Sequence, residues 1–136
     1  MAKKILIADD EPNIVAALEF LLQRNGYAVS IARNGDEALA LIETFTPDLV
    51  LLDIMMPMRS GYEVCKRLRE RPEWSRIKVI MLSAKGRDAE VSKGLATGAD
   101  LYVTKPFSTR ELMDKINQLL EDGSASGPAQ APPEPR

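Results

Sequence analysis

A single carboxylate ends an apolar run near the middle of the chain. In the segment PDLVLLDIMMPMRSG, residues 47–61, Asp53 directly follows the four apolar residues 49–52. A charge that leaves water for an apolar setting must be paired, bound to a metal or neutralised, because its desolvation is costly. We therefore expect Asp53 to have partners that other parts of the chain supply.

Three other apolar runs also end on polar side chains. These are Asp9 and Asp10 after residues 5–8, Ser83 after residues 79–82, and Lys105 after residues 101–104. In an open parallel sheet, ligands bind outside the carboxyl ends of the strands, where the strand order reverses. If the runs are parallel strands, three carboxylates, a hydroxyl and an ammonium meet at one rim.

This set of groups predicts a phosphoryl site that uses magnesium. Three converging carboxylates repel one another unless a cation is present, and ligands that are all oxygen select Mg²⁺ or Ca²⁺ over zinc. A site with few carboxylates and room for phosphate oxygens and water suits Mg²⁺. A lysine and a hydroxyl complement a phosphoryl group, so the implied chemistry is in-line phosphoryl transfer to a carboxylate.

Each of these residues, taken alone, has a simpler interpretation. The acids could favour a helix N-terminus or cap a helix, Ser83 could end a strand, and Lys105 could be a solvated lysine. Only their joint placement at successive strand ends favours a functional site.

The segments that must position these residues alternate between two patterns. Short, nearly continuous apolar runs predict strands that are covered on both faces, at residues 4–8, 28–32, 48–52, 78–82 and 101–104. Amphipathic segments lie between them, beginning with 13–24, which Pro12 precedes and Gly26 follows. The order βαβαβαβαβα predicts a parallel five-stranded α/β sheet with helices on both faces, and residues 28–32 form an edge strand.

Helix starts and buried faces can also be read from the sequence. Capping-box spacing occurs at Asn34–Glu37, Ser60–Glu63 and Ser108–Glu111. The last helix presents Leu112, Ile116, Leu119 and Leu120 on its buried face. Residues 89–100 form a weaker fourth helical pattern, because Gly94 lies inside it.

Composition narrows the possible functions. The 136 residues carry a net charge of −2, so nothing in the charge balance favours nucleic acid or an anionic membrane as partner. The chain has no histidine and one cysteine, Cys65, which excludes the usual zinc sites and Ser-His or Cys-His nucleophile pairs. We expect Cys65 to be a packed helix thiol. No segment resembles a signal peptide or a membrane span, so we expect a cytoplasmic protein.

The C-terminal segment differs from the rest in composition. Residues 123–136 are rich in proline, alanine, glycine and serine and contain no large apolar residue. We expect residues 1–122 to form one domain and residues 123–136 to be a disordered tail or linker, with an ordered arm as the less favoured alternative.

The four motifs together resemble a known family. ILIADDEP, DLVLLDIMMPMRSGYE, VIMLSAK and GADLYVTKPF, between about Lys3 and Leu120, are similar in order and spacing to the receiver domain of bacterial two-component response regulators. The resemblance implies a flavodoxin-like (βα)5 fold with strand order 2-1-3-4-5. It also implies a signalling switch in which Asp53 accepts a phosphoryl group from the phosphohistidine of a sensor histidine kinase or phosphotransfer protein.

The resemblance also implies roles for individual residues. Mg²⁺ would be coordinated by Asp10, Asp53 and the backbone carbonyl of Met55, with Asp9 acting through water. Lys105 would pair with the phosphoryl group, through a cis bond to Pro106. Ser83 would turn toward a phosphoryl oxygen, and Tyr102 would swing into the space that Ser83 leaves, as the two parts of a switch.

For Tyr102, the spacing alone and the resemblance predict different roles. On spacing alone it is a half-buried strand aromatic with its hydroxyl in water. Leu101 and Val91 stand where the family's DNA-binding members often carry salt-bridging residues. We therefore expect a monomer or a weak phosphorylation-dependent dimer, and an apolar surface for another partner.

The downstream partner stays open between two possibilities: a protein that docks on this domain, or an output domain beyond residue 122. We expect no turnover of an external substrate, so the chain is a signalling module more than an enzyme. Three alternatives stay open: a small hydrolase or phosphatase with an aspartyl nucleophile, a flavin or nucleotide module, and a degenerate receiver that is not phosphorylated. The cofactor module lacks a glycine loop for phosphate, and the hydrolase lacks an obvious cap domain.

Overall fold

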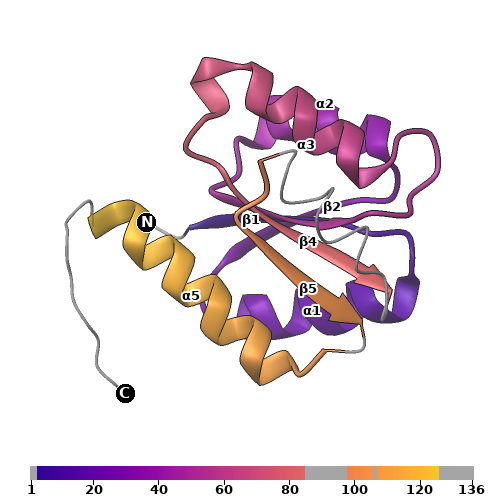
Figure 1. Ribbon diagram of the computed structural model, residues 1–136. Helices are drawn as coiled ribbons and strands as arrows, with labels where there is room; N and C mark the ends of the chain where they lie inside the picture. Colours follow the sequence, from indigo (N-terminus) through magenta and orange to yellow (C-terminus); the bar gives the residue numbers. More distant parts are fainter. Residues whose placement is uncertain (1–2, 85–97, 106, 126–136) are drawn as a thin grey trace.

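Five parallel strands form the centre of the molecule. The computed structural model describes residues 3–84, 98–105 and 107–125. The strands lie in the order β2-β1-β3-β4-β5, which confirms the fold expected from the sequence (Figure 1). Their bounds are β1 Lys4–Ala8, β2 Ala28–Ala32, β3 Leu49–Asp53, β4 Lys78–Ala84 and β5 Leu101–Lys105. β2 is an edge strand, as predicted.

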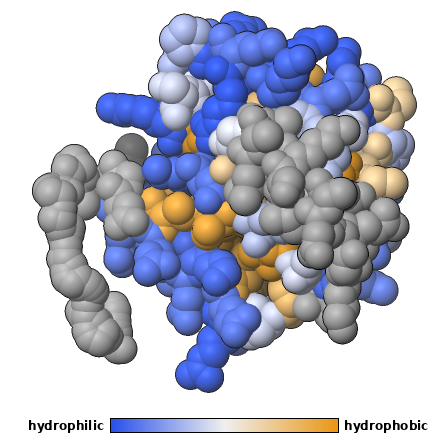
Figure 2. Space-filling view, in the orientation of Figure 1, coloured by the Kyte–Doolittle hydropathy of each residue, from blue (hydrophilic) through white to orange (hydrophobic). Residues whose placement is uncertain are grey.

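Helices cover both faces of the sheet. The helices in the described residues are α1 Pro12–Arg24, α2 Gly35–Phe45, α3 Gly61–Glu70 and α5 Thr109–Ala125, with a short 3₁₀ helix η1 at Pro72–Trp74. In Figure 1, α2 and α3 lie on one side of the sheet, and α1 and α5 lie on the other. The outer surfaces of the helices on the face in Figure 2 are largely hydrophilic, as amphipathic helices require.

Alternate residues of each strand enter two separate cores. In β1, Leu6 packs with the side chains of α2 and α3, whereas Ile5 and Ile7 pack with those of α1 and α5. This alternation explains why the strands read as continuous apolar runs, since both faces of each are covered. Cys65 is fully buried in the first of these cores, so it lies where the sequence placed it, as a packed helix thiol.

Helix starts follow the predicted caps with one variation. Ser60 and Glu63 form a complete capping box, and the hydroxyl of Ser108 accepts a hydrogen bond from the Glu111 N–H. Asn34 caps α2 through the Glu37 N–H at 2.8 Å. The Glu37 carboxylate, however, accepts from the Arg33 N–H at 2.7 Å, one residue earlier than a capping box requires.

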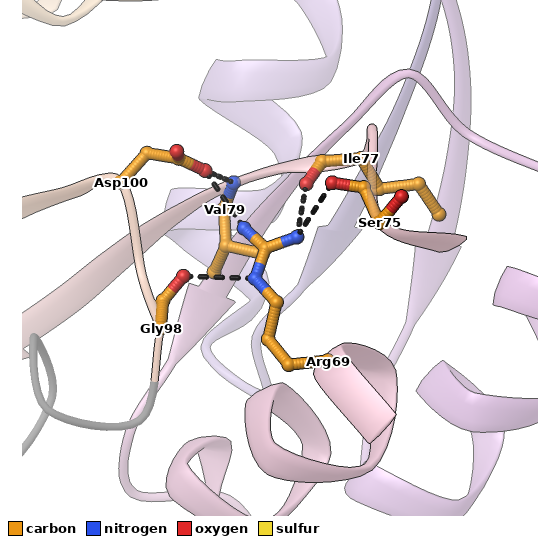
Figure 3. Close-up of polar contacts among 6 residues, drawn as sticks. All are labelled: Arg69, Ser75, Ile77, Val79, Gly98 and Asp100. Atoms are coloured by element: carbon orange, nitrogen blue, oxygen red, sulfur yellow. Dashed lines mark hydrogen bonds and ion pairs between the residues drawn. The ribbon is translucent and has the colours of Figure 1, made fainter. Parts of the chain in front are cut away.

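One arginine ties three segments together at the end of α3 (Figure 3). The Arg69 guanidinium donates to the carbonyls of Gly98 and Ile77, each at 2.8 Å, and to Asp100 Oδ2 at 2.9 Å. That carboxylate oxygen also accepts the Val79 N–H at 2.8 Å. Because Gly98 has a φ of 104° and an added Cβ would lie 2.8 Å from Arg69 Cγ, only glycine fits this contact.

The last helix runs further than the sequence suggested. α5 continues to Ala125, three residues past the domain boundary expected at 122, and residues 126–136 lie outside the described part of the chain. Leu112, Ile116 and Leu120 of α5 are buried as predicted, and Met113 joins them. The fourth helix expected at 89–100 falls almost wholly outside the described residues. None of the described helices is long and apolar enough to cross a membrane.

Candidate functional site

The parallel register brings the predicted polar residues to one edge of the sheet. Asp53 is the last residue of β3 and pairs with Leu82 of β4. The next residue, Ser83, pairs with Thr104, and Ala84 pairs with Lys105 at the end of β5. Because all five strands run in the same direction, their carboxyl ends deliver these side chains to a common rim.

Three carboxylates converge at this rim. Asp9, Asp10 and Asp53 each offer an oxygen, and these oxygens all lie within 4.8 Å of one another. Asp9 is fully buried, Asp53 is 5% exposed, and Asp10 is open to solvent. Water therefore screens the repulsion between Asp9 and Asp53 poorly.

Lys105 reaches across the rim to the acids. Its Nζ lies 3.1 Å from Asp9 Oδ2, 3.6 Å from Asp53 Oδ1 and 2.6 Å from Glu11 Oε1. Burial lowers the pKa of Lys105, but the hydrogen bond to Glu11 and the charges of Asp53 and Asp9 outweigh burial and raise the pKa above 10.5. Lys105 is therefore an ammonium at any physiological pH.

Asp53 holds its proton more tightly than an ordinary aspartate. Burial is the largest cause and the Asp9 charge the next; together they raise the pKa of Asp53 to about 6. Lys105 and the Met55 N–H, which donates to Asp53 Oδ1 at 3.3 Å, act in the opposite direction. The carboxylate of Asp53 thus stays ionised at neutral pH, but at a cost in free energy.

The donor set fits a hard divalent cation. In the described part of the chain, one ammonium faces three aspartates and Glu11, so negative charge is in excess at the rim. Carboxylate oxygens at this spacing are the ligands that Mg²⁺ prefers, and a cation between them would relieve the repulsion that raises the pKa of Asp53.

Three further predicted residues lie on β4, on β5 and in the segment that follows Asp53. Ser83 is buried in β4, and Tyr102 of β5 is half-buried and packs against the core beneath α2 and α3. The Met55 side chain is 65% exposed, and its backbone follows Asp53 by two residues. Pro106 and Val91 lie outside the described residues, whereas Leu101 is half-buried against the core beneath α1 and α5.

Glu11 is a site residue that the sequence did not single out. It is the third of three successive acids and directly precedes the first residue of α1, a position where acids are favourable. Its side chain makes no capping hydrogen bond and pairs with Lys105 instead. Its N–H donates to Asp9 Oδ1 at 2.9 Å, which helps to fix the buried aspartate.

Known proteins show the same arrangement of sequence and fold. Residues 5–117 match the family model of the response regulator receiver domain. The phosphate regulon transcriptional regulatory protein PhoB of Rhizobium meliloti is 46% identical over 120 residues, which cover 88% of this chain and 53% of PhoB. The alkaline phosphatase synthesis transcriptional regulatory protein PhoP of Bacillus subtilis is 43% identical over 129 residues, which cover 95% of this chain and 53% of PhoP.

Solved structures agree with the sequence comparison. A CheY-like receiver domain protein of Methanospirillum hungatei superposes with a TM-score of 0.85 at 34% identity, covering 93% of this chain and all of that one. The chain belongs to the receiver domains of two-component response regulators, a family of phosphoacceptor signalling domains. It spans about half the length of the curated relatives it matches. This membership favours signalling over the hydrolase and the cofactor-module alternatives.

Proposed function

We propose that this domain is a magnesium-dependent phosphoaspartate switch, with Asp53 as the phosphoacceptor. The observation that carries the proposal is the placement of Asp53, nearly buried, between two aspartates and the Lys105 ammonium at the carboxyl edge of the sheet. The buried nucleophile lies beside one ammonium and an excess of acids. Such a site can accept a cation together with a phosphoryl group.

The proposed reaction moves one phosphoryl group between proteins. An Asp53 oxygen attacks the phosphorus of a donor phosphohistidine, a P–O bond forms, and the P–N bond breaks. The electron pair stays on the donor imidazole, which takes a proton from water. These 136 residues contain no histidine, and we propose that the donor is a sensor histidine kinase or a phosphotransfer protein. Hydrolysis of the acyl phosphate resets the domain.

The residues at the rim have distinct proposed roles. Asp10, Asp53 and the Met55 carbonyl would hold Mg²⁺ directly, and Asp9 would hold it through water. Bound there, the cation supplies charge that offsets the equatorial phosphoryl oxygens. Lys105, already an ammonium beside Asp53, would move its charge to the same oxygens.

Ser83 and Tyr102 form the proposed switch. The Ser83 hydroxyl would donate to a phosphoryl oxygen, and Tyr102 would move inward with it. Since Met81 pairs with Tyr102 and Ser83 with Thr104, the two switch residues lie on neighbouring strands two positions apart in register. A new charge at Asp53 can therefore bias the packing of β5 over a short distance.

The partners of the whole protein are also proposals. The curated relatives are transcriptional regulatory proteins, which supports either a downstream protein target or an output domain. We propose that the domain works in the cytoplasm, does not itself bind nucleic acid, and is a monomer or a weak phosphorylation-dependent dimer. Its mass in solution, measured with and without beryllofluoride and Mg²⁺, distinguishes those two states.

Labelling by a small phosphodonor tests the proposal. With acetyl phosphate and Mg²⁺, the wild type is expected to gain one phosphoryl group, detected as an increase in intact mass, and Asp53→Asn is expected to gain none. Asp48→Asn serves as a control, because Asp48 lies at the opposite end of β3. Undiminished labelling of Asp53→Asn would refute the assignment of the phosphoacceptor.

A further inference from the structure

The loop that follows Asp53 is closed at its base. Residues 54–60 leave the end of β3 and return to the start of α3, where the Gly61 N–H donates to the Ile54 carbonyl at 2.9 Å. A Cβ added to Gly61 would lie 2.5 Å from the Asp53 carbonyl oxygen, so the two ends of the loop are in close contact. The loop therefore begins and ends at the phosphoacceptor.

The far side of the same loop is held by α2. The Pro57 carbonyl accepts two hydrogen bonds, from the Arg59 N–H at 2.9 Å and from the Gly35 N–H at 3.2 Å. The first of these closes a three-residue turn around Met58, whose φ of 74° is uncommon for a residue with a side chain. A turn of this hand costs free energy, so it persists only where neighbouring structure holds it.

Side chains reinforce this contact. Arg59 Nε lies 2.7 Å from Asp36 Oδ1, so the second residue of α2 pairs with the loop as well. Gly35 is buried, and a Cβ added there would lie 2.4 Å from both Cβ and the carbonyl oxygen of Arg59. The loop and the first turn of α2 are thus in contact without space for a methyl group between them.

We propose that the first turn of α2 positions loop 54–60 for the cation, with Gly35 and Arg59 as positioning residues. The loop carries the Met55 backbone, whose N–H already holds Asp53 Oδ1, and whose carbonyl completes the cation site in the proposed function on which this inference rests. A displacement of the far side of the loop passes to Met55, because the base at Ile54 and Gly61 is fixed.

Gly35→Ala tests the close contact. Among the described glycines, the positive φ values belong to Gly26 and Gly98, so Gly35 has a backbone that alanine can adopt. Alanine also favours a helix over glycine, so α2 itself is not weakened. We expect the variant to bind Mg²⁺ on the order of tenfold more weakly, as is typical when a residue that orients a metal ligand is changed. Calorimetric titration at pH 7.5 gives the dissociation constant without any phosphodonor.

Gly26→Ala is the matched control. Its Cβ would meet nothing within 4 Å, but its φ of 88° strains an alanine, so the variant loses stability at a distance from the loop. We expect its Mg²⁺ affinity to equal that of the wild type. An equal loss of Mg²⁺ affinity in Gly35→Ala and Gly26→Ala would overturn the inference, since general destabilisation would then explain the weaker binding.

Arg59→Gln provides a second test in which the sign of the effect is informative. Removing a positive charge near a cation site strengthens cation binding by electrostatics alone, whereas releasing the loop weakens it. We expect weaker Mg²⁺ binding in Arg59→Gln and unchanged binding in Arg71→Gln, which breaks the exposed Arg71–Glu73 ion pair instead. Tighter or unchanged binding in Arg59→Gln, together with wild-type affinity in Gly35→Ala, would overturn the inference. A wild type that does not bind Mg²⁺ would instead overturn the proposed cation site itself.

Discussion

Asp53 destabilises the fold that positions it. Its pKa of about 6 lies above the ordinary 3.8, because burial and the neighbouring Asp9 both disfavour the charged form. An unfolded chain releases this proton more readily than the folded chain does. Folding stability from this group is therefore highest below pH 4, falls as pH rises between about 4 and 6, and stays low above that window.

Asp53→Asn is expected to stabilise the protein when no cation is present. The amide keeps the shape and the acceptor for the Met55 N–H but removes the charge, so the free energy of unfolding should rise by about 2–3 kcal/mol at pH 7.5. The gain should be much smaller at pH 4, where Asp53 is protonated in the folded wild type and about half protonated in its unfolded state. Urea denaturation with a chelator at the two pH values measures it; an equal gain at both would contradict the electrostatic origin.

Lys105 restrains the pKa of Asp53. Because the Lys105 charge lowers the pKa of Asp53, Lys105→Met should raise it above about 6, whereas Lys105→Arg keeps the charge and should leave it close to the wild-type value. Carbon NMR of the aspartate side chains across pH 4–9, without Mg²⁺, follows the titration directly. A pKa of Asp53 that does not rise in Lys105→Met would show that the two groups do not interact.

At this scale the sequence predicted which residues meet, but only part of how they pair. The acids, Ser83 and Lys105 follow from strand ends, because each lies directly after an apolar run. The Lys105–Glu11 pair does not follow, since it depends on where a long side chain comes to rest among several acids. Likewise, the Glu37 carboxylate accepts a hydrogen bond from the Arg33 N–H and not from the Asn34 N–H. Residue spacing does not distinguish between these two adjacent donors.

The elements were more predictable than their contacts. Strands with both faces covered have a distinct apolar pattern, so the bounds of β1 and β2 match the prediction and those of the other strands shift by one or two residues. The junction between Gly35 and Pro57 has no local pattern, because the start of α2 and a loop distant in sequence meet only after the sheet has formed. The same holds for Arg69 of α3, whose partners lie on two other segments, one that contains Ile77 and one that contains Gly98 and Asp100.

Arg69 should stabilise the junction of α3, β4 and β5 more than an ordinary surface ion pair does. Three well-aligned hydrogen bonds to carbonyls and a carboxylate predict that Arg69→Met lowers the free energy of unfolding by about 2–4 kcal/mol. Lysine lacks the planar guanidinium that reaches several acceptors at once. Arg69→Lys should therefore recover only a minor part of the lost free energy of unfolding. Urea denaturation measures both variants.

Arg71→Met is the control for this prediction. Arg71 also lies at the end of α3, but it is exposed, pairs with Glu73 and stacks on Trp74, so its removal should change stability by less than about 1 kcal/mol. Equal losses of unfolding free energy in Arg69→Met and Arg71→Met would show that the contacts of Arg69 with backbone carbonyls contribute little to stability.

For the molecule as a whole, cation binding and folding should be linked. A ligand that binds only the folded state stabilises it by about 2.7 kcal/mol at a hundred times its dissociation constant. We expect Mg²⁺ to raise the thermal midpoint of the wild type and to raise that of Asp53→Asn much less, measured by circular dichroism against NaCl of equal ionic strength. An equal rise in both proteins would mean that the cation acts elsewhere.

The crowded acids at the rim set a limit on protein engineering. A substitution that neutralises Asp53 would rank as an improvement in any selection for heat resistance alone, because it removes a charge that burial and the neighbouring Asp9 disfavour. Such a selection would discard the phosphoacceptor chemistry proposed for this domain. A thermostable form that still signals must gain its stability elsewhere, for example on the solvent-facing sides of α2 and α5. The charged residues at this rim must stay unchanged.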